Sequence, residues 1–188
     1  MGSRGQGSGA NSALTSIVGR KGKAQNYSDA QRGTNPNYRK GNGNYHENCQ
    51  RCVTAYELRR RGYKVEALPF VNDEGNKNWY NAFEGQKWKF FFANRQTTAI
   101  NDIEKEVKSW GDGARGMVRW AWKGKRYGHV INVENRNGGV FYIDAQTNSQ
   151  DYSAKAHLYD FSPSSVMVSR VDNLNPNTKY LDKIVKRS

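Results

Sequence analysis

The sequence has few cysteines and histidines, the residue types that form disulfide bonds in small folds or bind metal ions. Its 188 residues include only two cysteines, Cys49 and Cys52, and three histidines. Two cysteines cannot form the disulfide framework of a small secreted domain, and four zinc ligands are hard to assemble from such a set. We therefore expect neither a bound metal nor another cofactor.

Long apolar runs are also lacking. No run approaches the roughly 18 apolar residues of a membrane-spanning helix, and the N-terminal residues do not have the apolar core of a secretory signal. The sequence therefore predicts no membrane partner, and export would have to use another route.

Negative charge is scarce relative to positive charge. The chain has 30 Lys and Arg against 17 Asp and Glu, which gives a formal net charge of +13. Residues 1–48 hold seven Lys and Arg and two Asp and Glu, so the excess is spread along the whole chain. Such an excess indicates a polyanionic partner or a protein partner with an acidic surface, and charge does not separate the two.

The chain is long enough for one domain with a core, because 36% of its residues are hydrophobic. Residues 1–44 are rich in Gly, Ser, Asn and basic residues and have almost no apolar periodicity. A segment of that composition buries too little apolar surface to offset the entropy of ordering it. We therefore predict a flexible basic linker or arm over residues 1–44 and a folded domain over residues 45–188.

The beginning of that domain predicts a helix that starts at Cys49. Asn48 is a favoured N-cap residue, and Cys49, Cys52 and Tyr56 recur at the spacing of one helix face. Gly62 follows three arginines and is suited to end the helix. A thiol at the first helical position lies near unpaired N–H groups and the positive end of the helix dipole, which favour the thiolate. Cys49 is therefore a candidate nucleophile.

The rest of the chain predicts one more helix and a set of strands. Residues 63–69 alternate as a short strand does, and residues 98–110 carry an apolar stripe at helical spacing. Residues 70–96 are too irregular to assign, and the basic tail over residues 180–188 is compatible with a helix. Further strands are predicted over residues 117–122, 127–134, 140–144 and 166–171. A helix-rich half followed by an antiparallel meander is an α+β arrangement.

The Asn-Gly pair at residues 137–138 predicts a tight hairpin, because both residue types tolerate the positive φ of a type I′ turn. With these two residues as the loop, His129 lies opposite Gln146 and has Asp144 as its diagonal neighbour on the same face. With residues 136–137 as the loop, His129 faces Asp144 directly. An odd-length loop without a bulge would put the two on opposite faces, so their proximity depends on this register.

A thiolate needs an imidazole to carry protons, and the imidazole needs an acceptor that fixes its tautomer. Cys49, His129 and Asp144 supply these groups. The three blocks that contain them resemble the papain-fold toxin family, over roughly residues 36–150. The blocks are Asn48-Cys49-Gln50-Arg51-Cys52-Val53, Gly128-His129 and Asp144-Ala145-Gln146. That family includes protein-glutamine deamidase effectors of bacterial pathogens and C-terminal toxin domains of polymorphic and phage-associated proteins.

The resemblance implies a papain-like cysteine hydrolase fold over residues 45–188, with an N-terminal catalytic helix packed on an antiparallel β meander. It implies a catalytic triad of Cys49, His129 and Asp144. It also implies that Cys52 is not the nucleophile. Cys52 is then either a redox partner that joins its sulfur to that of Cys49 or a small core residue one turn further along the helix.

The papain pattern also includes an amide side chain ahead of the nucleophile, which helps to form the oxyanion hole. The sequence has no Gln at the usual upstream spacing. Asn44 or Asn48 would therefore have to serve beside the backbone N–H of Cys49. Gln146 is expected to support the site through hydrogen bonds.

By this resemblance the protein is expected to be a bacterial or phage-associated toxin or effector that deamidates a glutamine side chain of a target protein. Such a toxin would be delivered or secreted, act in the cytoplasm of a target cell, and have a cognate immunity protein with an acidic surface. It could equally be carried as part of a larger protein or a virion.

Two other functions stay open. The same triad would serve a papain-like cysteine peptidase or a transglutaminase, because acyl transfer is common to all three. The basic charge also fits a nucleic-acid-binding accessory module with a vestigial triad, which would bind in a salt-dependent way.

Overall fold

The computed structural model describes residues 7–38, 43–147 and 157–188. In chain order its elements are α1 (Gly7–Val18), α2 (Tyr27–Thr34), η2 (Gly43–Tyr45), α3 (Cys49–Arg60), β1 (Val65–Ala67), α4 (Glu74–Asn78), η3 (Trp79–Asn81), β2 (Lys89–Phe90), α5 (Gln96–Ser109), β3 (Arg115–Ala121), β4 (Gly128–Arg136), β5 (Gly139–Ile143), η4 (Pro163–Ser165), β6 (Met167–Arg170), α7 (Thr178–Leu181) and β7 (Val185–Arg187).

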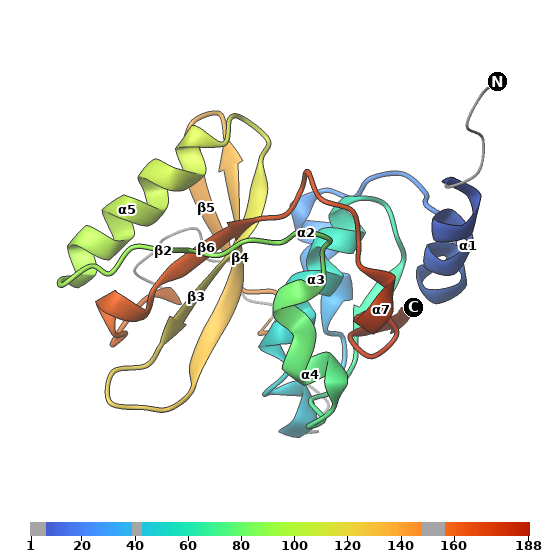
Figure 1. Ribbon diagram of the computed structural model, residues 1–188, viewed down its shortest axis with the longest axis horizontal. Coiled ribbons are helices and arrows are strands. Elements are labelled where there is room, and N and C mark those ends of the chain that lie inside the picture. Colours follow the sequence, from blue (N-terminus) through green and yellow to red (C-terminus); the bar gives the residue numbers. More distant parts are fainter. Residues whose placement is uncertain (1–6, 39–42, 148–156) are drawn as a thin grey trace.

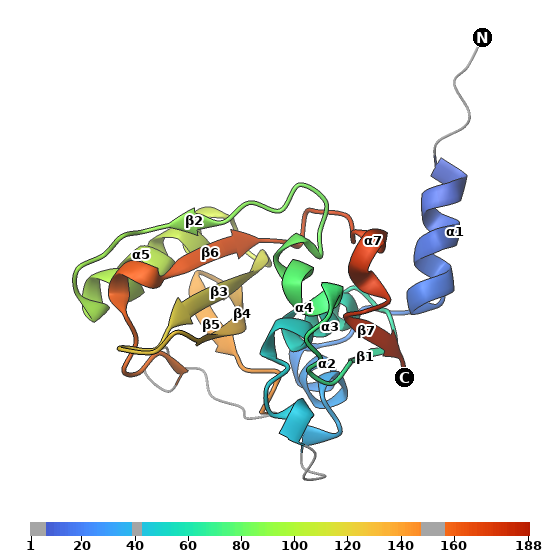
Figure 2. The same ribbon diagram turned by 60° about the horizontal axis from the view of Figure 1, so that its bottom comes forward.

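The strands of the described residues form two antiparallel sheets. The larger has five strands in the order β2-β6-β3-β4-β5, and β1 pairs with β7 in the smaller. The consecutive strands β3, β4 and β5 form the predicted meander, and they follow a largely helical N-terminal half. The α+β class predicted from the sequence is therefore confirmed. The larger sheet separates α5 from the group of helices that contains α2 and α3 (Figures 1 and 2).

Each face of the larger sheet supplies an apolar core, because neighbouring residues of a strand point to opposite faces. Val118 of β3 is buried in the core that includes Ile103 of α5. The next residue back, Met117, is buried in the core that includes Tyr56 of α3. The helical stripe predicted over residues 98–110 accordingly packs on the sheet. The predicted helix that starts at Cys49 covers the opposite face.

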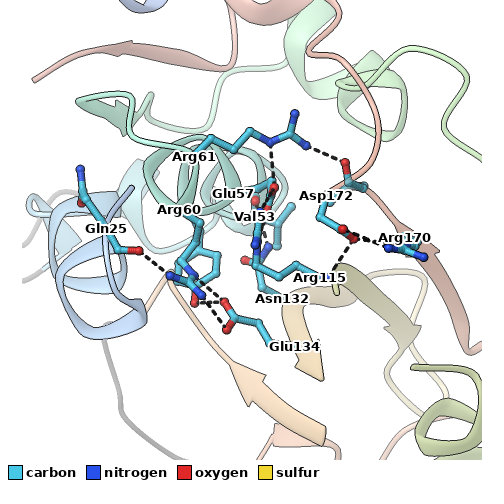
Figure 3. Close-up of polar contacts among 12 residues, drawn as sticks. Gln25, Val53, Glu57, Arg60, Arg61, Arg115, Asn132, Glu134, Arg170 and Asp172 are labelled. Atoms are coloured by element: carbon cyan, nitrogen blue, oxygen red, sulfur yellow. Dashed lines mark hydrogen bonds and ion pairs between the residues drawn. The ribbon is translucent and has the colours of Figure 1, made fainter. Parts of the chain in front are cut away.

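Buried ion pairs attach the C-terminal half of α3 to the sheet (Figure 3). The fully buried Glu57 carboxylate accepts two hydrogen bonds from the Arg115 guanidinium of β3, at 2.8 and 2.9 Å. It also accepts one from Arg61 Nε at 2.8 Å. Asn132 of β4 adds a hydrogen bond from Nδ2 to the carbonyl oxygen of Val53, at 3.0 Å. These contacts fix the position of α3 relative to β3 and β4.

A second buried carboxylate, that of Glu134 in β4, completes this attachment. It accepts hydrogen bonds from Arg60 Nε at 2.8 Å, from Arg136 Nε at 2.8 Å and from the Tyr56 hydroxyl at 2.6 Å. Burial raises the pKa of Glu134, but the guanidinium groups outweigh burial and hold it below its usual value. Arginines at the end of α3 therefore bind specific buried carboxylates.

The structure differs from the predicted flexible arm at residues 7–38, which contain α1 and α2. Val18 and Ala30 from these helices are buried in the same core as α3. Arg187 of β7 donates hydrogen bonds to carbonyl oxygens near the end of α1, those of Thr15 and Ser16. Part of the predicted arm is therefore packed against the rest of the chain. Residues 1–6 and 39–42 lie outside the described residues.

Two other segments differ from their sequence-based description. Residues 70–96, which showed no regular pattern, contain the short elements α4, η3 and β2. The tail over residues 180–188, described as compatible with a helix, contains the end of α7 and then β7, which pairs with β1. No helix in the described part of the chain has the length and apolar character that crossing a membrane requires.

Candidate active site

The helix α3 begins at Cys49, as the sequence predicted, and so carries a thiol at its N-terminus. It ends at Arg60, and Gly62 follows with a φ of 105°, a conformation that glycine adopts without strain. The Cys49 residue is 8% exposed. Cys49 is therefore largely buried from solvent, although the residue still lines a cleft.

The Asn137–Gly138 hairpin sets the register that brings His129 and Asp144 together. Both loop residues have positive φ, 51° and 81°, and the flanking residues Arg136 and Gly139 pair across the ladder. This is the first of the two registers considered from the sequence, in which Asp144 is the diagonal neighbour of His129. His129 Nε2 lies 2.9 Å from Asp144 Oδ2.

Gly128, at the start of β4, lies where two backbones approach closely. A Cβ atom at this position would be 1.8 Å from the carbonyl oxygen of Trp120 in β3. The next residue, His129, pairs with Trp120 in the same ladder. The absence of a side chain at Gly128 therefore allows β4 to run close to β3 directly before the histidine.

The surroundings of His129 favour its protonated form. Burial acts to lower its pKa, but the hydrogen bond with Asp144 and the interaction with the Cys49 thiol outweigh burial and raise the pKa from 6.5 to about 10. Because Asp144 binds Nε2, Nδ1 is the ring nitrogen through which His129 would interact with Cys49. Burial raises the pKa of Asp144, and the hydrogen bond with His129 more than offsets this, so the pKa of Asp144 is lowered.

The helix α2 supports the segment that carries Asp144. Gln31 of α2 donates from Nε2 to the backbone oxygen of Asp144 at 3.1 Å. Asn35, directly after α2, donates from Nδ2 to the backbone oxygen of Gln146 at 2.9 Å. The Asp144 Oδ1 atom accepts the backbone N–H of Gln146 at 3.0 Å. A helix inside the predicted arm thus helps to fix the candidate catalytic acid.

Asn48, one of the amides predicted for the oxyanion hole, lies in a buried polar cluster behind the site. Its side chain makes no N-cap hydrogen bond to α3. Its Nδ2 atom donates to Leu68 O at 2.9 Å and to Asn35 Oδ1 at 3.2 Å, and its Oδ1 atom accepts from the Cys52 thiol at 3.3 Å. Both N–H groups of this amide therefore already have acceptors other than a ligand at Cys49.

The other two predicted amides differ in their distance from the site. Asn44 is exposed and is not among the residues that line the cleft at Cys49. Gln146 does line the cleft and is 6% exposed, and its Nε2 atom donates to the backbone oxygen of His46 at 2.9 Å. The structure therefore brings Gln146, and not Asn44, to the site.

Cys52 lies one turn along α3 from Cys49 and is 1% exposed. Both sulfurs are free thiols, so the structure contains no disulfide between them. Burial raises the pKa of the Cys52 thiol well above its usual value, with a further contribution from Cys49. Cys52 is therefore a core residue in this structure, which agrees with one of the two roles considered for it.

Cys49, His129 and Asp144 line one cleft of about 940 Å³. The cleft has an aromatic wall that the sequence reasoning did not assign to the site: Phe70, Trp122, Tyr127 and Tyr159. The Trp122 ring stacks on the His129 ring at a centroid distance of 6.3 Å. The sequence contains part of the signal for Trp122, because Trp120 and Trp122 are spaced as two residues on one face of a strand. The structure adds that Trp120 is the ladder partner of His129.

The cleft lining also includes polar residues that the sequence did not predict for the site, among them Gln50 and His157. Gln50 directly follows Cys49, and its Oε1 atom lies 3.6 Å from the Cys49 sulfur. His157 is 7% exposed and contributes to the lowered pKa of Asp144. In the described ranges, no three His, Cys, Asp or Glu side chains are grouped so that they could hold a metal ion.

A comparison with protein-family models gives a match to part of the chain. The model described as papain fold toxin 1, glutamine deamidase, matches residues 47–149. That span covers more than half of the chain and includes Cys49, His129 and Asp144. The chain belongs to this family.

The match to the papain-fold toxins confirms the resemblance shown by the three sequence blocks, and the α+β architecture is consistent with it. The family description indicates a toxin with glutamine deamidase activity. Comparisons with curated proteins and with solved structures gave no match.

Proposed function

We propose that this papain-fold toxin deamidates a glutamine side chain of a target protein, with Cys49 as nucleophile, His129 as proton carrier and Asp144 as the residue that orients His129. One observation supports the proposal above the others. A thiol at a helix start shares a cleft with a histidine whose Nε2 atom is 2.9 Å from a buried carboxylate. These are the groups that thiol-dependent acyl transfer requires.

In the first half of the proposed reaction, the Cys49 thiolate donates an electron pair to the carbon of the glutamine carboxamide. The π electrons of the C=O bond move onto oxygen, which becomes an oxyanion. When the C=O bond re-forms, the C–N bond breaks, and the nitrogen takes a proton from His129 and leaves as ammonia. The product is a thioester between Cys49 and the side chain.

Hydrolysis of the thioester completes the cycle. His129, now neutral, accepts a proton from a water molecule as the oxygen of that water attacks the thioester carbon. The C–S bond then breaks, the Cys49 thiolate and protonated His129 are restored, and the released carboxylic acid loses its remaining proton to solvent to give a glutamate side chain. Asp144 keeps the imidazole in one orientation through both halves of the reaction.

A cysteine peptidase would use the same three residues. The cleft of about 940 Å³ is large enough to hold a segment of a peptide substrate, which supports this second candidate. The two reactions differ in the leaving group, which is ammonia in one case and the amino end of a peptide in the other. Mass spectrometry of a treated protein separates them, because deamidation leaves the backbone intact whereas peptide hydrolysis shortens the chain.

The proposal extends to delivery and partners. Membership of a toxin family suggests that the domain is carried to a target cell, where it would act on a cytoplasmic protein. We further propose a cognate immunity protein with an acidic surface, because the chain has a formal net charge of +13. Binding of that partner would weaken as salt is added. Binding that is insensitive to salt would count against an acidic partner surface.

Expression in a bacterial host tests the proposed function. Wild type, Cys49→Ala and the matched control Cys52→Ala are induced to equal levels, growth is followed, and host proteins are searched for glutamine converted to glutamate. We expect growth arrest and conversion with wild type and with Cys52→Ala, and neither with Cys49→Ala. Equal growth of all three strains without conversion would contradict the proposal, and conversion by Cys49→Ala would remove Cys49 from its role.

A further inference from the structure

The two amides predicted for the oxyanion hole, Asn44 and Asn48, and the supporting amide of Gln146 are all placed or hydrogen-bonded elsewhere in the structure. Both N–H groups of the Asn48 amide are directed to Leu68 O and Asn35 Oδ1. The Gln146 amide donates to a backbone oxygen, and Asn44 is exposed and outside the cleft lining. If one of these residues served, it would first have to give up a buried hydrogen bond or move into the cleft.

Gln50 is the carboxamide that lies beside the thiol. It follows Cys49 in the first turn of α3, is partly buried and lines the cleft. Its Oε1 atom lies 3.6 Å from the Cys49 sulfur. Among the described residues this is the one side-chain hydrogen bond that the Gln50 carboxamide makes. Its N–H groups therefore stay available to a ligand in the cleft.

We infer that Gln50 supplies the side-chain donor of the oxyanion hole, an inference that rests on the proposed glutamine deamidation. The donor would then come from the residue after the nucleophile and not from a residue ahead of it in the chain. Cys49 would supply the second donor through its backbone N–H, because the first N–H groups of a helix have no acceptor within the helix.

The contact seen in the resting protein is compatible with this role. While Cys49 is a neutral thiol, its S–H group donates to Gln50 Oε1, and ionisation to the thiolate that the proposed reaction uses removes this donor. The last side-chain torsion of glutamine is broad and roughly two-fold, so a half turn puts Nε2 where Oε1 lies. When the sulfur bonds to the substrate carbon, the substrate oxygen is one bond away from that carbon. A group that touches the sulfur is therefore within reach of the oxygen as its negative charge develops.

The size of the effect can be anticipated from the physics of such sites. A donor aimed at an oxyanion forms a charge-assisted hydrogen bond only in the transition state, so its loss lowers kcat and leaves substrate binding little changed. Removal of one such donor lowers kcat by about 10²-fold to 10³-fold. A residue that acted by keeping the thiol reactive would instead change the rate at which Cys49 is alkylated.

The test uses the full chain and two substitutions, Gln50→Met, which keeps the length of the side chain without a donor, and Gln50→Glu, which replaces the N–H groups with oxygen. Gln96→Met is the control, because Gln96 at the start of α5 is not part of the cleft lining and its Nε2 atom donates to Phe161 O at 3.0 Å, so the variant reports the loss of a glutamine hydrogen bond away from the cleft. Three readouts are taken: ammonia release from an N-blocked glutamine dipeptide and from unfolded casein, alkylation of Cys49 by iodoacetamide, and affinity for a peptide with a glutamate-semialdehyde side chain. The thiol adds to that aldehyde and converts its oxygen into a mimic of the oxyanion.

We expect both Gln50 variants to lose about 10²-fold in kcat and a similar factor in aldehyde affinity. In Gln50→Met, KM and the alkylation rate should stay within about threefold of wild type, whereas the carboxylate of Gln50→Glu should also slow alkylation because it disfavours the nearby thiolate. Gln96→Met should match wild type in every readout. Unchanged kcat and aldehyde affinity in Gln50→Met would overturn the inference, and so would an alkylation rate of that variant that falls together with its kcat.

The aldehyde separates failure of the inference from failure of the proposed function. If wild type releases no ammonia yet binds the aldehyde through Cys49, the proposed deamidation fails while the Gln50 variants still decide the oxyanion donor. If wild type does neither, both proposals fall.

Discussion

The Nε2 atom of His129 lies 2.9 Å from Oδ2 of Asp144, and both side chains belong to a cleft that also contains Cys49. The two residues are fifteen positions apart in the chain, and a hairpin with a two-residue loop brings them together. The consequence is electrostatic. A buried carboxylate favours the protonated imidazole, and the protonated imidazole keeps the carboxylate ionised.

Replacing the carboxylate should lower the pKa of His129. Asp144→Asn keeps the size of the side chain and removes the negative charge, so the pKa of His129, about 10 in the wild type, should fall toward or below 6.5. Titration of the His129 ring followed by NMR measures this directly. We expect kcat to fall by at least about 10²-fold at neutral pH as well. A His129 pKa that does not change would show that Asp144 does not stabilise the imidazolium.

The same pKa predicts how stability depends on pH. The pKa of His129 is raised from 6.5 to about 10 in the folded protein, so the folded state binds more protons than the unfolded state between these values. The contribution of His129 to the free energy of unfolding is therefore fully present below 6.5 and is lost as pH rises through about 10.

Urea unfolding of wild type and His129→Asn at neutral pH and near pH 10 tests this dependence. The free energy of unfolding should fall more in the wild type than in the variant over that interval. If the two proteins lose the same amount, His129 does not titrate with a raised pKa.

The buried ion pairs of Glu57 in α3 should contribute more to the free energy of unfolding than exposed ion pairs do. Glu57→Ala leaves the guanidinium groups of Arg61 and Arg115 without their buried carboxylate, which should lower the free energy of unfolding by about 3–5 kcal/mol. Glu74→Ala is the control, because the side chains of the Glu74–Lys77 pair are 56% and 60% exposed and such pairs contribute about 1 kcal/mol or less. Urea unfolding of both variants gives the comparison. Equal losses would mean that the Glu57 pairs do not hold α3 on the sheet.

The contact between α2 and the segment around Asp144 gives a further prediction. Asn35→Ala removes a buried amide and leaves the backbone oxygens of Gln146 and Tyr45 without this donor, which should cost about 1–3 kcal/mol of unfolding free energy. Because the same segment carries Asp144, kcat should fall too. Asn101→Ala on the exposed face of α5 is the control, with a change of less than about 0.5 kcal/mol. If activity is unchanged in Asn35→Ala, α2 does not position the catalytic acid.

Local sequence patterns were sufficient for the parts of the site that depend on a single element or a single turn. The helix that starts at Cys49 follows from apolar spacing, Asn48 and Gly62. The placement of His129 and Asp144 on one face follows from a two-residue loop at the Asn-Gly turn, and of the two registers that the sequence left open the structure has the one with residues 137–138 as the loop. In each case the information lies within a few residues of the chain, where turn chemistry and periodicity act.

Contacts between distant segments could not be predicted in this way. The helix α2 has few apolar residues, and it is fixed by the hydrogen bonds of Gln31 and Asn35 to residues more than 100 positions away. Apolar periodicity does not report such contacts, so the composition of residues 1–44 predicts a flexible arm. Contacts with distant segments also explain why the Asn48 side chain does not cap α3. Asn48 is a residue type favoured at the N-cap position, but its amide forms hydrogen bonds in a buried cluster.

The most direct test of the account is deamidation in water enriched in the heavy oxygen isotope. Wild type, Cys49→Ala and Cys52→Ala are each incubated with unfolded casein in such water, and the glutamine-containing peptides are measured by mass spectrometry. We predict that wild type and Cys52→Ala convert glutamine to glutamate carrying one heavy oxygen atom, because water hydrolyses the thioester on Cys49. Cys49→Ala should give no conversion. Cleavage of the casein backbone without glutamate formation, or equal conversion by Cys49→Ala, would contradict the central claim.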